Sequence, residues 1–348
     1  MDLTRREFIW RSVLAGGVVT ALPVCARPGE ANASTFEPAY ARLEEAGELE
    51  GRVEKAYEML GSCRLCPREC GVNRLRGRRG VCRAPADVVV HNFAPHLGEE
   101  IPLTGRRGSG TIFFSNCNLR CVFCQNWPIA HEGRGEQVSD EVLAAVMLEL
   151  QRVGCHNINL VTPTHVLPNI LQATRLALHQ GLRIPLVYNT GGYERPEMIR
   201  LLDGVVDIYL PDVKYMDGAE AARYSAGARD YPERATASVL EMHRQVGGLV
   251  TDADGIALRG LMIRHLVMPD RVAGTRAFVE WVARELPRDT YVNIMAQYRV
   301  DYLAFNHPRI ARAIRPQEFL EAMDWAEEAG LTNLDERSLA QLQIHRRR

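Results

Sequence analysis

Short segments that resemble β-strands alternate with segments that resemble α-helices about six times between residues 106 and 300. Such alternation predicts one parallel sheet whose strands are joined by right-handed helical crossovers. We therefore expect an α/β fold, a partial (β/α)6 barrel of the TIM type with an N-terminal Cys-rich module. The expected strands are 110–115, 157–161, 184–188, 206–210, 260–268 and 290–295, and the expected helices are 139–153, 168–180, 196–202 and 234–246.

The length of the chain leaves room for more than this barrel. One α/β barrel takes roughly 200 to 250 residues, so 348 residues allow a barrel with appendages. The 46% share of hydrophobic residues excludes global disorder, and 42 basic against 43 acidic side chains give no overall attraction to nucleic acid. We expect an export signal at 1–33, a helical module with four cysteines at 34–105, the barrel at 106–300 and a helical extension at 301–348.

Polar residues follow the expected strands, where the chain leaves the sheet. In a parallel barrel the carboxyl ends of all strands share one rim, and active sites lie there. A single polar residue at a strand end often only caps the next helix, but six strands in succession end this way. The residues placed on the rim in this manner are Thr162, Thr164, Asn189, Asp212, Lys214, Arg264, Gln297 and Tyr298.

Seven of the nine cysteines form two groups, and the second group has the spacing Cys117-x3-Cys121-x2-Cys124. Three thiolates at these offsets can bind one face of a 4Fe-4S cluster and leave the fourth iron without a protein ligand. An open metal position can bind a substrate, as it does in catalytic zinc sites. The alternatives are a redox dithiol at Cys121 and Cys124, a zinc site that lacks a ligand, or disulfides.

The first group consists of Cys63, Cys66, Cys70 and Cys82, with Pro and Gly residues between them that predict a turn-rich knuckle rather than a helix. Four soft ligands close a tetrahedral site, which suits zinc or an auxiliary iron–sulfur cluster. A structural role and an electron relay are both open, as are two disulfides in an oxidising compartment.

These motifs together resemble the radical S-adenosylmethionine (SAM) superfamily, and within it a group related to pyruvate formate-lyase activating enzyme. The resemblance covers residues 63–330 and rests on the segments 63–74, 108–114, 121–126, 157–165, 187–193, 207–215 and 264–269. Activating enzymes carry Gly-Gly-Glu after the second strand, where this chain has Thr162-Pro163-Thr164. Their Asp-x-Lys pair and their strand-five arginine correspond to Asp212, Lys214 and Arg264.

The resemblance implies that SAM binds the open iron and that one electron from the cluster cleaves it to a 5′-deoxyadenosyl radical. This radical would abstract hydrogen from a substrate, for which a backbone glycine of a partner protein, a peptide side chain and a small molecule are all open. The expected reductant is a flavodoxin or ferredoxin. The residues expected to contact SAM are Thr162, Thr164, Asn189, Asp212, Lys214 and Arg264.

The sequence also allows a competing function, and it offers candidate proton donors for the enzymatic one. The competing function is a non-catalytic iron–sulfur or zinc protein, which transfers electrons or assists assembly on the same fold. Candidate proton donors near the mouth of the barrel, with ordinary structural roles as the alternative, are His91, His96, Glu99, Glu100 and His165.

The N-terminus places Arg5 and Arg6 before an apolar run at 12–24 that is too short to span a bilayer. This pattern resembles a twin-arginine export signal, with a cleavage site at Ala31-Asn32-Ala33. We expect export to the periplasm or the outer face of the membrane, with a cytoplasmic location as the alternative. No later segment has 18 consecutive apolar residues, so no membrane span is expected in the mature chain.

Overall fold

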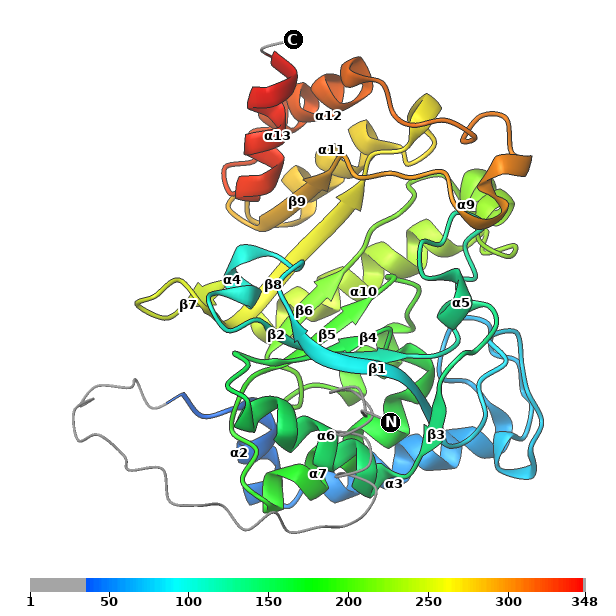
Figure 1. The fold of residues 1–348 in the computed structure, drawn as a ribbon, viewed down its shortest axis with the longest axis vertical. Helices are drawn as coiled ribbons and strands as arrows, with labels where there is room; N and C mark the ends of the chain where they lie inside the picture. The colour runs from blue at the N-terminus through cyan, green and yellow to red at the C-terminus, as the bar shows by residue number, and fades with distance from the viewer. Residues whose placement is uncertain (1–35, 347–348) are drawn as a thin grey trace, which may run out of the picture.

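The computed structural model describes residues 36–346, so the predicted export signal at 1–33 lies outside the described residues. The described part folds around one sheet of nine strands, which crosses the centre of Figure 1. The strands follow the order β3-β1-β2-β4-β5-β6-β8-β7, and β9 pairs with β8. They are β1 (Val88–His96), β2 (Ser109–Phe114), β3 (Glu136–Val138), β4 (Ile158–Val161), β5 (Leu186–Thr190), β6 (Ile208–Pro211), β7 (Val250–Thr251), β8 (Ala257–Leu266) and β9 (Tyr291–Met295).

The six predicted strands are β2, β4, β5, β6, β8 and β9, and each runs parallel to the next in chain order. β5 and β6 are buried at every position, as expected for parallel strands that are covered on both faces. Among the described residues no pairing joins β9 to β3, so the barrel is open. The predicted α/β fold with a partial barrel is confirmed.

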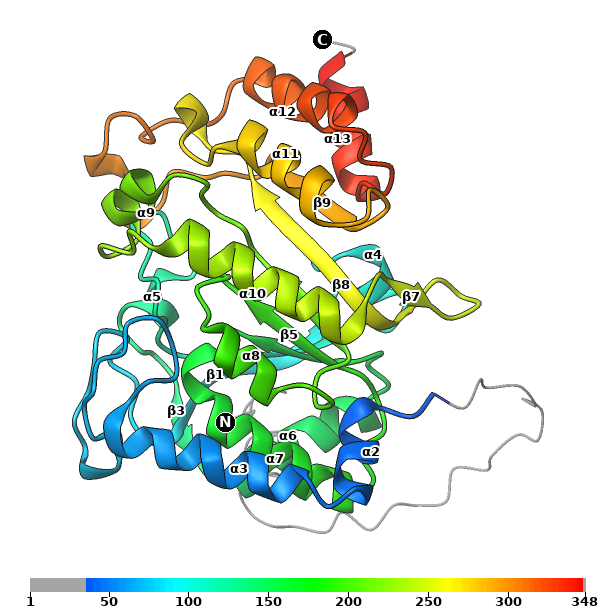
Figure 2. The same cartoon turned by 180° about the vertical axis from the view of Figure 1, so that it is seen from behind.

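Helices cover the outside of the sheet. α10 and α8 lie over β5, β6 and β8 in Figure 2, while α11 to α13 gather around β9. In the described part no helix is long and apolar enough to cross a membrane. The helices are α2 (Ala39–Glu45), α3 (Leu49–Glu58), α4 (Ile101–Thr104), α5 (Trp127–Ala130), α6 (Asp140–Arg152), α7 (Leu167–His179), α8 (Pro196–Leu201), α9 (Gly218–Tyr224), α10 (Tyr231–Val246), α11 (Thr275–Glu285), α12 (Pro316–Glu328) and α13 (Glu336–Arg346). Short 3₁₀ helices occupy Met59–Ser62, Arg74–Arg76, Thr164–Val166, Pro269–Arg271 and Tyr302–Asn306.

The start of α6 shows how local sequence fixes an element. Ser139 caps the helix by accepting the backbone N–H of Val142 at 3.4 Å, and Asp140 places negative charge at the positive end of the helix dipole. Asp140 also accepts hydrogen bonds from Tyr57 of α3 and Asn169 of α7. The same carboxylate therefore begins one helix and joins it to two others.

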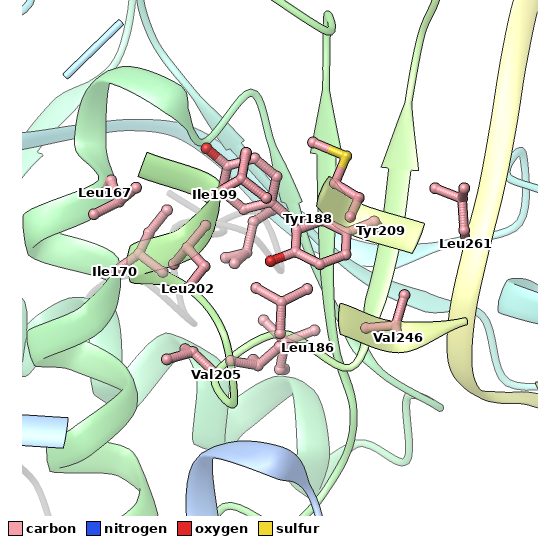
Figure 3. Close-up of a cluster of buried hydrophobic side chains, with 14 of the residues drawn as sticks. Leu167, Ile170, Leu186, Tyr188, Ile199, Leu202, Val205, Tyr209, Val246 and Leu261 are labelled. Carbon is pink, nitrogen blue, oxygen red and sulfur yellow. The ribbon is translucent and has the colours of Figure 1, made fainter. Parts of the chain in front are cut away.

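The core lies between the outer face of the sheet and the helices that cross it. Figure 3 shows Tyr188 of β5 and Tyr209 of β6 among the side chains of α7, α8 and α10, including Ile170, Ile199 and Val246. The two tyrosine rings meet edge to face, with their centroids 5.9 Å apart. Burying each large apolar side chain contributes roughly 1.5–3 kcal/mol, so this layer holds the strands in place and with them the strand ends.

Strand β1 differs from the expectation that residues 34–105 are helical apart from the knuckle. It pairs antiparallel with β2 and with β3, and so extends the sheet on the side away from β8. The segment Val88-Val89-Val90 is rich in β-branched residues, which favour strands. The sheet therefore begins in the N-terminal segment, before the cysteine loop.

Candidate active site

The carboxyl ends of the parallel strands surround a cavity of about 430 Å³. Small-molecule sites typically measure about 300–1,000 Å³. In Figures 1 and 2 the edge towards which β8 points carries α5 and α9, which flank the cysteine loop. The predicted site residues that line the cavity are Cys117, Cys121, Cys124, Thr162, Asn189, Asp212, Lys214, Arg264 and Gln297. The strand ends thus bring the three thiols and the charged side chains to one cavity.

The cysteine loop, residues 115–126, is held by contacts from distant parts of the chain. Asn118 donates through Nδ2 to the carbonyl of Tyr193 at 2.8 Å, and the N–H of Val122 donates to the carbonyl of Tyr224 at 2.9 Å. The carbonyl of Val122 accepts the N–H of Leu303 at 2.9 Å. These partners follow β5, end α9 and lie in the last 3₁₀ helix, so the barrel as a whole sets the course of the loop.

The sulfur atoms of this loop form no disulfide in the described structure. Ser225 donates through Oγ to Sγ of Cys121 at 3.1 Å. Burial raises the pKa of Cys121 to about 11 and that of Cys124 to about 12, so these two thiols are protonated at neutral pH unless a metal binds them. A metal centre that accepts thiolates would release these protons. Three sulfur donors on one wall of a cavity fit a 4Fe-4S cluster with one iron that has no protein ligand.

A network of charged side chains lies at the same cavity. Asp212 accepts hydrogen bonds from Nζ of Lys214 at 2.5 Å and from Nε of Arg264 at 2.7 Å. Arg264 also donates to the side-chain oxygen of Asn189, and its Nη1 lies 3.2 Å from Oε2 of Glu99. The four ionisable side chains are only 10–18% exposed. They therefore interact strongly with one another and with any bound charge.

The pKa values of this network follow from burial and from the two cations. Burial opposes the ionisation of Asp212, but Arg264 and Lys214 outweigh it and lower its pKa. Burial likewise opposes the charge on Lys214, and Asp212 outweighs it and raises its pKa. Burial raises the pKa of Glu99 to about 7, against the opposing effect of Arg264. At neutral pH two cations therefore face one full and one partial negative charge, which favours a ligand with a carboxylate.

A close approach of two strand ends requires glycine at position 192. Its φ is +80°, and a Cβ there would lie 2.2 Å from the carbonyl oxygen of Asp212. The hydroxyl of Tyr231 accepts the backbone N–H of Lys214 at 2.9 Å and lies 2.8 Å from the carbonyl oxygen of Gly191. The segment after β5 is thereby fixed against the segment that carries Asp212 and Lys214.

Two rim residues do not line the cavity, which corrects the expectation for them. Thr164 lies in the 3₁₀ helix after β4, and its hydroxyl donates to the carboxylate of Glu194 at 2.5 Å instead of facing the cavity. Tyr298 is buried, and its hydroxyl donates to the carbonyl of Ile310 at 2.7 Å. In both cases a hydrogen-bond partner far away in the sequence draws the side chain inward.

Of the five candidate proton donors, two line the cavity and three do not. His96 and Glu99 line the cavity, and His91 and Glu100 do not. His165 is buried, with Nε2 2.7 Å from the carbonyl oxygen of Ser115, and burial lowers its pKa to about 4. His165 is therefore a neutral structural residue below the rim, not a proton donor at the mouth.

The buried carboxyl of Glu194, below the rim, is expected to make the stability of the protein depend on pH. Its Oε1 accepts hydrogen bonds from Thr164 and Thr190, and burial raises its pKa to about 7. As pH rises from 4.5 towards 7, the unfolded state releases its proton first, so the free energy of unfolding falls by up to about 1.4 kcal/mol per pH unit. Glu194→Gln keeps the neutral shape and is expected to reduce the fall of thermal stability with rising pH between pH 4.5 and 7. Glu136→Gln, on exposed β3, should retain the wild-type slope, and an equally steep slope in E194Q would contradict this account.

The four cysteines of the knuckle also meet. Cys63, Cys66, Cys70 and Cys82 line a second, smaller cavity of about 10 Å³. No α-helix lies between the first and the last of them, and none of them forms a disulfide in the described structure. The knuckle lies beside α5 in both Figure 1 and Figure 2, on the side of the molecule that carries the cysteine loop.

Two residues that support the cysteine loop have no clear signal in the sequence. Arg68 donates through Nε to the carbonyl of Asn118 at 3.0 Å and through Nη2 to the carbonyl of Ser225 at 2.9 Å. The hydroxyl of the same serine donates to Cys121. The position of Arg68 between Cys66 and Cys70 is the one hint of a special role, and Ser225 carries none.

Known proteins include relatives of this chain. The uncharacterized protein MJ0674 of Methanocaldococcus jannaschii is 32% identical over 292 residues, which cover 81% of this chain and 79% of that protein. A solved structure of TYW1 with a lysine-pyruvate adduct bound has a TM-score of 0.39 and 13% identity, and the match covers 63% of this chain and 73% of the other. The model of the Radical SAM superfamily matches residues 111–251, which include the cysteine loop and the ends of β4, β5 and β6. The chain belongs to the radical SAM superfamily.

Proposed function

We propose that this enzyme cleaves SAM reductively at the cysteine loop and directs the resulting radical to a C–H bond of a substrate in the same cavity. One observation carries the proposal: three thiols and the network of Asp212, Lys214 and Arg264 line one cavity of about 430 Å³. When bound, a 4Fe-4S cluster supplies the electron that splits SAM into methionine and a 5′-deoxyadenosyl radical.

The charged residues have distinct tasks in this proposal. Lys214 lines the same cavity as Cys121 and donates a hydrogen bond to Asp212, so this side chain joins the cysteine loop to the polar network. We assign the carboxylate of SAM to Lys214 and Arg264, because a buried carboxylate needs a cationic partner. Asp212 keeps both cations in position before the ligand arrives. Asn189 and Thr162 supply neutral polar groups for the ammonium and the ribose hydroxyls.

The apolar part of the lining protects the reaction from water. Phe113, Leu119 and Phe123 belong to it, and the ring of Phe123 packs against Tyr215 and Tyr298 with centroid distances of 6.4 and 5.9 Å. A closed, dry site prevents a reactive intermediate from meeting solvent first. These side chains therefore limit the radical to the substrate that the cavity admits.

The substrate and reductant are proposed from the resemblance to activating enzymes. The residues that match their Asp-x-Lys pair and arginine, Asp212, Lys214 and Arg264, are hydrogen-bonded together. On the resemblance alone, we infer a backbone glycine of a partner protein as the hydrogen donor, and a flavodoxin or ferredoxin as the reductant. Because Thr162-Pro163-Thr164 replaces Gly-Gly-Glu, the ammonium of SAM must instead meet Thr162 or Asp212.

The test is reductive cleavage of SAM by anaerobically reconstituted protein. We expect 5′-deoxyadenosine, measured by liquid chromatography and mass spectrometry, to form only when both dithionite and SAM are present. A control without reductant should form none. If protein with a fully loaded cysteine loop forms no 5′-deoxyadenosine, the enzymatic proposal is wrong and the electron-transfer alternative is favoured.

A further inference from the structure

We propose that Cys63, Cys66, Cys70 and Cys82 bind a second iron–sulfur cluster, a 4Fe-4S cluster with all four irons ligated, and not zinc. Nothing in the superfamily match assigns this site, because the match begins at residue 111. The proposal rests on the cavity that the four cysteines line, on the backbone donors around them and on one buried cation. It does not depend on the function proposed for the cysteine loop.

The space that the four cysteines share favours a cluster over zinc. In a Zn(Cys)4 site each sulfur lies about 2.3 Å from the metal, so the sulfurs are roughly 3.8 Å apart and leave no space between them. Here the four cysteines line a cavity of about 10 Å³, which is room for about one water-sized sphere. Among the described residues no three His, Cys, Asp or Glu side chains are arranged to hold a single metal ion. The three cysteines of the cysteine loop are likewise not arranged around a single ion. Both groups therefore suit a centre with several metal ions.

Backbone N–H groups point at the sulfur atoms of the knuckle. The N–H of Val81 donates to Sγ of Cys70 at 3.4 Å, and the N–H groups of Arg68 and Ala84 donate to the sulfurs of Cys66 and Cys82. Hydrogen bonds of this kind stabilise cluster thiolates and tune their potential. In the cysteine loop the N–H of Asn126 donates to Cys124 in the same way, two residues after the cysteine.

A buried cation at this cavity needs a negative partner. Arg74 is only 2% exposed and lines the cavity. Its guanidinium donates to the backbone carbonyls of Pro85 and His165, and among the described residues it forms no ion pair. An uncompensated buried charge is strongly destabilising. Four thiolates on a metal centre carry the net negative charge that would compensate Arg74, whereas four neutral thiols would not, so Arg74 favours a loaded site over four free thiols.

The two cysteine groups are linked, which decides how the proposal must be tested. Arg68 of the knuckle holds the carbonyl of Asn118 in the cysteine loop. The carbonyl of His165 accepts a hydrogen bond from Arg74, and its ring nitrogen Nε2 lies 2.7 Å from the carbonyl oxygen of Ser115 in the cysteine loop. Variants of the knuckle are therefore expected to disturb both sites, and the clean variant removes the ligands of the loop and leaves the knuckle intact.

The test is metal analysis of the full chain with Cys117, Cys121 and Cys124 all replaced by alanine. After anaerobic reconstitution we expect about four iron and four sulfide per chain, negligible zinc, and an electron paramagnetic resonance (EPR) signal on reduction that SAM does not change. About one zinc with no iron, or neither metal with four reactive thiols, would overturn the proposal. Because the loop ligands are absent, a failure of SAM cleavage in the wild type does not affect this result.

A second measurement covers the case in which the triple variant does not fold. Mössbauer spectra and metal analysis of wild-type protein loaded with ⁵⁷Fe should show about eight irons per chain. Cys70→Ser, at a partly exposed ligand, should alter the EPR signal that is insensitive to SAM. Cys155→Ala, a buried cysteine outside both groups, should leave it unchanged. About four irons in the wild type together with stoichiometric zinc would contradict the second cluster.

Discussion

Replacing Cys121 by alanine is expected to abolish SAM cleavage and to lower the iron content by about four atoms per chain. A 4Fe-4S cluster with an open iron has three protein ligands, and loss of one leaves a second iron without protein ligation. Cys121 is buried, and its carbonyl lies 3.0 Å from Nε2 of His131, so the loop is held firmly at this position. The measurement is 5′-deoxyadenosine formation together with iron and sulfide analysis.

The matched control for this variant is Cys155→Ala. Cys155 is also a buried, free cysteine, but it lies before β4 and away from both cysteine groups. This variant should lose stability through a small cavity while it retains full iron content and activity. Activity in C121A comparable to that of C155A would remove the cysteine loop from the mechanism.

Asp212→Asn is expected to cause the largest loss of stability of any single change at the polar rim. It removes the negative charge between Lys214 and Arg264, and breaking a buried pair in this way typically costs about 3–5 kcal/mol. For a chain of this size that corresponds to a fall in Tm of roughly 4–7 °C. Thermal unfolding of the anaerobic protein measures this fall, and isothermal titration with SAM should show weaker binding, because the two cations lose their common anchor.

The control for Asp212 is Asp203→Asn, which breaks a pair on the surface. Asp203 lies 2.5 Å from Arg244, with side-chain exposures of 42% and 56%. Exposed pairs contribute about 0–1 kcal/mol, so Tm should fall by about 2 °C or less. Equal effects of D212N and D203N would show that the rim network is not buried in solution.

The sequence predicted the features of the site that depend on strand order. Asn189 and Arg264 lie within the last three residues of β5 and β8, and Asp212 directly follows β6. Neighbouring parallel strands bring such positions together, whatever the loops that follow them. The cysteine spacing predicted the loop in the same direct way, because its ligands lie within eight residues of one another.

Features that depend on distant side chains could not be predicted. Thr164 turns inward because Glu194 lies beneath it, and nothing near Thr164 in the sequence indicates that partner. Strand β1 requires an antiparallel neighbour, β2, that is more than ten residues further along the chain. Arg68 acts on backbone carbonyls, which every residue possesses, so its target leaves no mark in the sequence.

The central claim is that SAM binds the open iron of a cluster held by Cys117, Cys121 and Cys124. EPR of freshly reduced, fully reconstituted protein with and without SAM tests it most directly. The account predicts that SAM shifts the g-values of one cluster signal, and that this shift is absent from C121A and retained in C155A. A cluster signal in wild-type protein that SAM leaves entirely unchanged would contradict it.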